Sequence, residues 1–426
     1  MEMKDWRPFR IESVGEIFQK YFDAMQKYIY RIRFTSAEYQ RKEMRLDFKR
    51  FRLSLWACIR TILQCLLSLA IRFNRNEEVN SSFEFLKEKL DLDIRKFNLI
   101  IFLCILFMES YWLFSFHHVI NYRLRIVNVF DDCIKNSDRI LFLKNRQHLI
   151  DGFVLVSFII GTIAKITKII LLLLYCSVAA IIIYLTSILH NPIAIIVIVF
   201  FMFVSIQHFD GFSNIVYVIM IFFSFTLKFY HIRFKELIIR LRSIVSAIRM
   251  RNTFYYIESF AIRHLNEDYV KICDQIHRIN VHTSQDFMFM ELMFKYVMIF
   301  STYQLQKYSI SHFMVIVFVV LTLQFFLINH ALYFMAAKLP ISNQLYYQLS
   351  VNIDARIQFK TMRKFQKRNG PAICTKLKAN TFMQLVNENR VGLSCDGMYL
   401  LTKMKLIEIF SLNVVLNILI YKHFIR

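Results

Sequence analysis

Apolar residues in this chain are gathered into long runs, and most charged residues fall between the runs. Two clear runs occupy 53–73 and 97–117, and each holds about the twenty residues that a helix needs to cross a bilayer. A soluble helix instead alternates an apolar face with a polar one. The pattern therefore predicts an all-α protein that spans a membrane repeatedly.

The middle of the chain is harder to divide, because four apolar runs lie between residues 153 and 230 with short interruptions. Asn191-Pro192 separates them, since a proline disfavours helix at the residue before it. Counting every run as a span would give nine crossings. We instead predict a third span within 152–189 and a fourth within 194–232, each longer than the bilayer and tilted or extended. Later runs, around 287–304, 311–336 and 406–421, complete seven spans.

The charge of the loops predicts how these spans are oriented. Residues 1–52 carry 13 basic against 8 acidic residues, and 338–405 carry 12 against 3, whereas 72–96 is balanced with 6 of each. Excess Lys and Arg marks cytosolic loops. We therefore expect a cytosolic N-terminus and an extracellular C-terminus. Asn80 begins an Asn-Ser-Ser glycosylation sequon in the balanced loop, which agrees with an outer location.

Charge and apolarity together divide the chain into six segments. The predicted division is a cytosolic amphipathic region (1–52), transmembrane helices one to four (53–232), a cytosolic helical loop (233–284), transmembrane helices five and six (285–337), cytosolic anchor helices (338–405) and a seventh transmembrane helix (406–426).

Composition excludes several functions. The net charge of +23 could indicate nucleic-acid binding, but the aromatic and glycine-rich binding signatures are missing, and basic inner loops explain the charge. We find no catalytic motif, no phosphate-binding loop and no Cys or His spacing typical of a metal site, so we expect no enzyme activity, no cofactor and no metal. The orientation is opposite to that of a G-protein-coupled receptor.

The last apolar run carries a narrow polar stripe. Asn413, Asn417 and Tyr421 recur every four residues and so share one face of a helix. Amide groups are costly in lipid, so this face must meet protein or water. One interpretation is a pore wall formed by copies of the helix around an axis. The other is hydrogen bonding between helices.

Two short patches resemble the insect gustatory and odorant receptor superfamily, and gustatory receptors most closely. The first is Ser394-Cys395-Asp396-Gly397-Met398-Tyr399, which resembles the short element before the seventh span of that family. The second is the basic amphipathic stretch from Tyr269 to Asn280, before the fifth span. The overall layout also agrees along most of the chain. The family's terminal Thr-Tyr and Gln-Phe pairs are degraded here: Leu416-Asn417 or Val414-Val415 stands at the first, depending on the register.

The resemblance implies a chemosensory receptor of the plasma membrane. Members of the family are ligand-gated, non-selective cation channels in which four subunits share a central pore lined by the seventh helix. It implies a tastant or other small molecule as ligand, and related receptor subunits as partners in a homo- or hetero-tetramer. The pore-lining residues it implies are Asn413, Asn417, Ile420 and Tyr421. The loss of the terminal pairs leaves open a divergent, non-sensory member with a structural or trafficking role and no conducting pore.

Polar residues near the spans are candidates for a site. Arg60 and Glu109 both fall in the cytosolic half of the first two spans, where they could pair; alternatively, Arg60 extends to the interface and Glu109 binds backbone or water. A ligand pocket should be apolar with a few polar anchors. The candidates are Tyr111, Trp112, Gln207, His208, Tyr303, Gln304 and Gln324.

Overall fold

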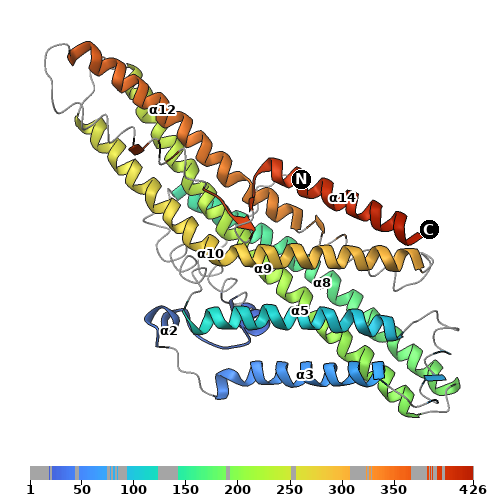
Figure 1. Ribbon diagram of the computed structural model, residues 1–426. Coiled ribbons are helices and arrows are strands. Elements are labelled where there is room, and N and C mark those ends of the chain that lie inside the picture. The colour runs from blue at the N-terminus through green and yellow to red at the C-terminus, as the bar shows by residue number, and fades with distance from the viewer. Residues whose placement is uncertain are drawn as a thin grey trace, which may run out of the picture. The chain divides into compact units, whose positions relative to one another are not determined.

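The computed structural model is a helical chain in which two-residue strands form a single small hairpin among the described residues (Figure 1). It describes residues 22–43, 48–73, 94–122, 143–188, 192–250, 256–307, 329–365, 391–395 and 399–425, with isolated residues such as Asn80 between them. The elements in chain order are η2 (Gln26–Tyr30), α2 (Ser36–Arg41), α3 (Phe48–Phe73), α5 (Ile94–Ile120), α8 (Leu143–Ile188), α9 (Pro192–Met250), α10 (Tyr256–Lys307), α12 (Lys338–Phe365), β1 (Ser394–Cys395), β2 (Tyr399–Leu400) and α14 (Lys403–Ile425).

The four apolar runs in the middle of the sequence lie in two long helices. The 46 residues of α8 and the 59 of α9 extend about 70 and 90 Å at 1.5 Å per residue, well beyond a bilayer core. Pro192 is the first residue of α9, where its missing N–H costs nothing and its fixed φ suits the helix. Within the described residues, three segments are long and apolar enough to cross a membrane: Ser54–Phe73, Gln147–Leu173 and Ser213–Ala247.

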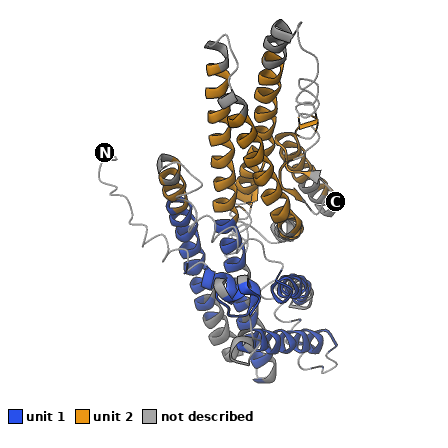
Figure 2. Cartoon of the chain, turned by 90° about the vertical axis from the view of Figure 1, so that its left-hand side faces the viewer, with its two compact units in different colours: residues 1–124, 154–222, 304–321 blue, residues 125–153, 223–303, 322–426 orange. Residues whose placement is uncertain are grey.

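The chain forms two compact units, shown in different colours in Figure 2. The first contains residues 1–124, 154–222 and 304–321, and the second contains residues 125–153, 223–303 and 322–426. Consequently, α8 and α9 each contribute one part to the first unit and one to the second.

In the first unit, the N-terminal segment packs against α5, and α5 packs against α3. In the region predicted to be amphipathic, the described chain is helical from Phe22 to Tyr30 and then turns at Arg31, which has φ 55° and follows the π-helical turn η2. The Gln26 side chain bonds to both backbone groups of Phe34, which closes the turn. Phe22, Met25 and Ile29 are buried, so the apolar residues of this amphipathic region form part of the core of the first unit.

In the second unit, aromatic side chains from α9, α10 and α12 form a buried core. The Tyr269 and Tyr346 rings stack 4.5 Å apart and nearly parallel, and the Tyr269 hydroxyl donates a 2.7 Å hydrogen bond to Asn343. A second buried centre surrounds Glu291, whose carboxylate accepts a 2.6 Å hydrogen bond from Tyr333 and pairs with Lys295 at 3.3 Å.

The two patches that resemble chemoreceptors meet in the second unit. The Asn280 side chain accepts a 2.7 Å hydrogen bond from the Ser394 backbone N–H and donates a 3.0 Å bond to the Ser394 hydroxyl. Ser394 belongs to β1, which pairs antiparallel with β2 just before α14. The end of the Tyr269–Asn280 stretch therefore fixes the segment from which the last helix begins.

Candidate functional site: a charged cavity in the first unit

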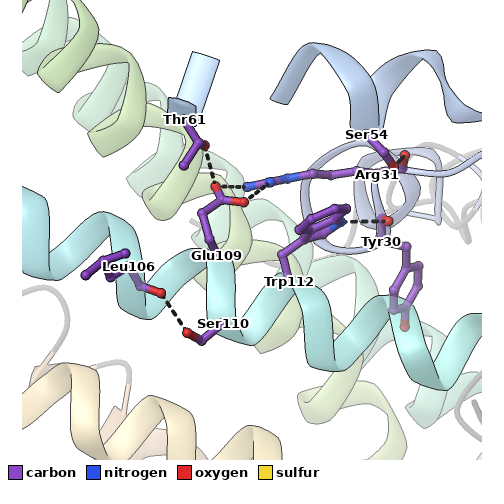
Figure 3. A network of polar contacts seen from close by, with 8 residues as sticks. All are labelled: Tyr30, Arg31, Ser54, Thr61, Leu106, Glu109, Ser110 and Trp112. Atoms are coloured by element: carbon purple, nitrogen blue, oxygen red, sulfur yellow. Dashed lines mark hydrogen bonds and ion pairs between the residues drawn. The ribbon is translucent and has the colours of Figure 1, made fainter. Parts of the chain in front are cut away.

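A buried ion pair in the first unit joins the N-terminal turn to α5. The Arg31 guanidinium binds both carboxylate oxygens of Glu109, at 2.5 and 2.9 Å (Figure 3). Two parallel charge-assisted bonds of this kind are strong and fix the geometry. Only 6% of the Arg31 side chain and 13% of the Glu109 side chain are exposed. The pair therefore depends on both charges being present.

Neighbouring groups hold both partners of this pair. Thr61 of α3 donates a 3.0 Å hydrogen bond to the Glu109 carboxylate, and Ser54 of the same helix donates a 2.5 Å bond to the Arg31 carbonyl (Figure 3). The Trp112 indole N–H donates to the Tyr30 carbonyl at 3.2 Å, and the Arg31 guanidinium lies 5.0 Å from the Trp112 ring centre, within cation–π range. The N-terminal turn is thus anchored to two helices.

The ion pair lies beside an open cavity of about 580 Å³, lined by the N-terminal segment and by α3, α5, α8 and α9. Apolar side chains such as Met108 and Leu171 form part of its wall. The remaining wall is polar and mostly basic, and its charged and amide side chains are Lys27, Arg31, Arg60, Lys168, Gln207 and Asp210. This volume is within the usual range for small-molecule sites.

The partner of Glu109 differs from the one the sequence suggested. Arg31, not Arg60, pairs with Glu109. Arg60 lines the cavity, together with Arg31 and Asp210. Its Nε is buried and has no hydrogen-bond partner among the described residues. Sequence reasoning missed Arg31 because it lies 78 residues before Glu109, in the N-terminal region that we expected to be cytosolic.

The ligand candidates are distributed unevenly. Of the seven, Gln207 lines the cavity, while Tyr111 and Trp112 are buried in the first unit. His208 lies in α9 and Tyr303 and Gln304 in α10, where the backbone alone is described, and Gln324 lies outside the described residues. The structure thus places one predicted anchor in the cavity wall. Asn80, the predicted glycosylation site, is half-buried.

The last helix shows two different faces. Asn413 is only 3% exposed in a single copy of the chain, so its side chain faces the interior of its own unit. Val415, two positions further and hence about 200° around the helix, is exposed. A side chain that lines an axis shared between copies should be exposed in one copy alone. Asn413 therefore does not lie on the exposed face of α14. For Asn417, Ile420 and Tyr421, only the helical backbone is described.

Comparisons with known proteins show the class to which this fold belongs. No protein-family model matches the sequence, and no curated protein matches it. The chain is, however, similar along its whole length to solved insect olfactory receptors. The predicted all-α, seven-transmembrane-helix class is thereby confirmed.

The particular structures come from Machilis hrabei. The olfactory receptor OR5 in complex with eugenol is 12% identical, with a TM-score of 0.57, over 97% of this chain and 97% of that chain. A second structure of OR5 is 11% identical, with a TM-score of 0.60, over 96% of this chain and 99% of that chain. The likeness establishes the fold of an insect olfactory receptor.

Proposed function

We propose that the protein is a subunit of an insect chemoreceptor that acts as a ligand-gated, non-selective cation channel in the plasma membrane. The observation that carries the proposal is the end-to-end likeness to a receptor solved with the small molecule eugenol, which covers 97% of both chains. Helices of spanning length and the exposed apolar face of α14 support it. A gustatory role, with a tastant as ligand, is the finer form of the proposal and rests on the sequence patches.

In this proposal, four copies assemble around α14, either alone or with related subunits. The N-terminus is cytosolic and the C-terminus extracellular, as the charge of the loops predicts. The side of α14 that faces other copies is the exposed one, which includes Ser411, Val415 and Ile418 at helical spacing. A constriction of apolar side chains can close a pore by excluding water. Asn413 then faces the interior of its own subunit.

The function is tested by expressing the protein in cells that lack chemoreceptors, alone and with a chemoreceptor co-receptor. Whole-cell recording during application of volatile and sapid compounds should show a cation current that needs both the ligand and the protein. Surface labelling serves as the control for delivery to the membrane. If the protein reaches the surface under both conditions and none of the compounds evokes a current, the result would support the alternative, a structural or trafficking role.

The position of the pore is tested separately, by cysteine substitution in the conducting channel. We expect a charged thiol reagent to block the current of Val415→Cys and to leave that of Asn413→Cys unchanged, because only the first side chain is exposed in one subunit. Block at Asn413→Cys without block at Val415→Cys would restore the amide stripe as the pore wall.

The chemosensory ligand is expected in the outer half of the helices. The candidates are Tyr303 and Gln304, at the outer end of the fifth span, and Gln324, near the middle of the sixth. Alanine substitutions there should shift the ligand concentration for half-maximal current and leave the maximal current unchanged. The same shift from substitutions at Tyr111 or Trp112 would place the ligand beside the N-terminal turn instead.

A further inference from the structure

We propose that the cavity of the first unit binds a phosphate monoester, carried by the headgroup of a phosphoinositide lipid in the inner leaflet. This site is distinct from the outer ligand site of the proposed function. It rests on the charge, burial and surroundings of the cavity wall.

The first step is the charge of the wall. Four basic side chains line the cavity, and Glu109 neutralises one of them, Arg31. Lys27, Arg60 and Lys168 have no ion-pair partner within the part of the chain that the structure describes. Asp210 is the single acidic residue of the described wall, and its carboxylate accepts a 3.1 Å hydrogen bond from Asn214. Two positive charges are therefore left without compensation, which matches the charge of about −2 on a phosphate monoester.

The second step is the state of Arg60. Its Nε is buried without a hydrogen-bond partner among the described residues, and Arg31, which carries a like charge, lines the same cavity. Leaving a buried charged donor unsatisfied is costly, so an arginine in this position is expected to have an acceptor. A phosphate oxygen in the cavity would supply one, and guanidinium groups bind phosphate well because of their planar fork of donors.

The third step is the surface next to the cavity. Trp56 and Leu172, both in the cavity wall, are 67% and 61% exposed. They continue into exposed apolar side chains on the same helices, which include Ile59 and Leu63 of α3 and Ile169 and Leu173 of α8. These faces belong to segments apolar enough to cross a membrane. An acyl chain could therefore leave the cavity along an apolar surface while its headgroup stays among the cations.

The fourth step is depth. Trp56 and Arg60 lie within about two helical turns of the start of the first span, or roughly 10 Å from the interface. The N-terminal segment that forms another wall is cytosolic in the predicted orientation. Basic pockets between helices on the cytosolic side are typical sites for phosphoinositide headgroups. Phosphatidylcholine, whose headgroup carries no net charge, and phosphatidylserine, with one negative charge, complement the cavity less well.

Binding can be measured on the purified full-length protein by native mass spectrometry, without any channel activity. We expect phosphatidylinositol bisphosphate to bind at least about tenfold more tightly than phosphatidylserine, and phosphatidylcholine to bind weakest. Arg60→Gln and Lys168→Gln should each lower the affinity for the bisphosphate lipid about tenfold. Lys165→Gln is the matched control, because it removes the same charge from the same helix, at an exposed position outside the cavity wall.

Competition separates the two possible sources of the phosphate. If soluble inositol trisphosphate displaces the lipid, the headgroup alone is sufficient; if it does not, the acyl chains contribute, and either result supports the site. Lys168 is exposed, so its variant stays informative if Arg60→Gln fails to fold. Equal affinity for all three lipids, or an equal loss in Lys165→Gln and Lys168→Gln, would overturn the proposal. The binding measurement needs no channel current. Lipid binding can therefore be refuted while the channel function is confirmed, or confirmed while the channel function is refuted.

Discussion

Removing the charge of Glu109 should destabilise the first unit more than almost any other single change at a polar residue. Glu109→Leu would leave Arg31, which is 5% exposed, buried without its counter-charge, and would also remove the acceptor of Thr61. Breaking one side of a buried ion pair typically costs about 3–5 kcal/mol. Removing both partners costs less, since no uncompensated charge stays behind. Glu109→Leu combined with Arg31→Met should therefore recover much of the loss.

The magnitude can be followed by thermal unfolding of the detergent-solubilised protein. With an unfolding entropy of about 2 cal/mol/K per residue, the unfolding midpoint of a chain of this length falls by roughly 1 °C for each kcal/mol of lost stability. Glu109→Leu should therefore lower the midpoint by several degrees. The control is Glu43→Gln, which removes the partner of Arg41 from a 4.0 Å surface pair that is more than half exposed on both sides. Such pairs contribute about 0–1 kcal/mol. If the two variants shifted the midpoint equally, or if the double variant were less stable than Glu109→Leu, the reasoning would be refuted.

Three further predictions concern the second unit, and the first of them has its control, Gly211→Ala, in the first unit. Gly392→Ala would place a Cβ 2.9–3.0 Å from neighbouring side chains and should lower the stability measured by thermal unfolding by about 1–2 kcal/mol. Gly211 lies in a helix, and a Cβ added there would have no neighbouring atom within 4 Å, so Gly211→Ala should be neutral or stabilising by up to about 1 kcal/mol. Asn280→Ala removes two hydrogen bonds to Ser394 and should speed amide exchange at β1, while an unchanged exchange rate would show that this contact does not hold the strand. Burial raises the pKa of Tyr346 above its usual value near 10, so above pH 10 the folded state keeps a proton that the unfolded state releases. The stability of the fold is therefore fully present below pH 10 and falls as the pH rises further. Tyr346→Phe should make the unfolding midpoint less sensitive to alkaline pH than that of the wild type.

The cavity and the last helix connect these stability experiments to the proposed function. Loss of the Arg31–Glu109 pair would release the N-terminal turn, which forms one wall of the cavity. Glu109→Leu should therefore weaken phosphoinositide binding as well as thermal stability. Asn280→Ala acts in the other unit, on the segment that leads into α14, so it should alter channel gating while lipid binding stays at the wild-type level.

The sequence determined the class of the protein because the features that define it are local. Long apolar runs without strong helix breakers must become helices in a bilayer, where every backbone polar group needs an internal partner. Asn191-Pro192 marks the boundary at which α8 has ended and α9 begins, for a reason that concerns only neighbouring residues. The two patches that resemble chemoreceptors were also visible in the sequence, and the whole fold is similar to that of solved insect olfactory receptors.

Tertiary structure decided which polar residues meet. Arg31 and Arg60 are equally plausible partners for Glu109 by chemistry, and only the turn at Arg31 and the bonds from Ser54 and Thr61 place the first within reach of the carboxylate. In the same way, helical periodicity puts Asn413 on a stripe, but it gives no information on whether that stripe faces an axis or its own subunit. Burial depends on which elements pack against the helix, and this is set by contacts between residues far apart in the chain. Periodicity specifies a face of each helix, whereas packing specifies what that face meets.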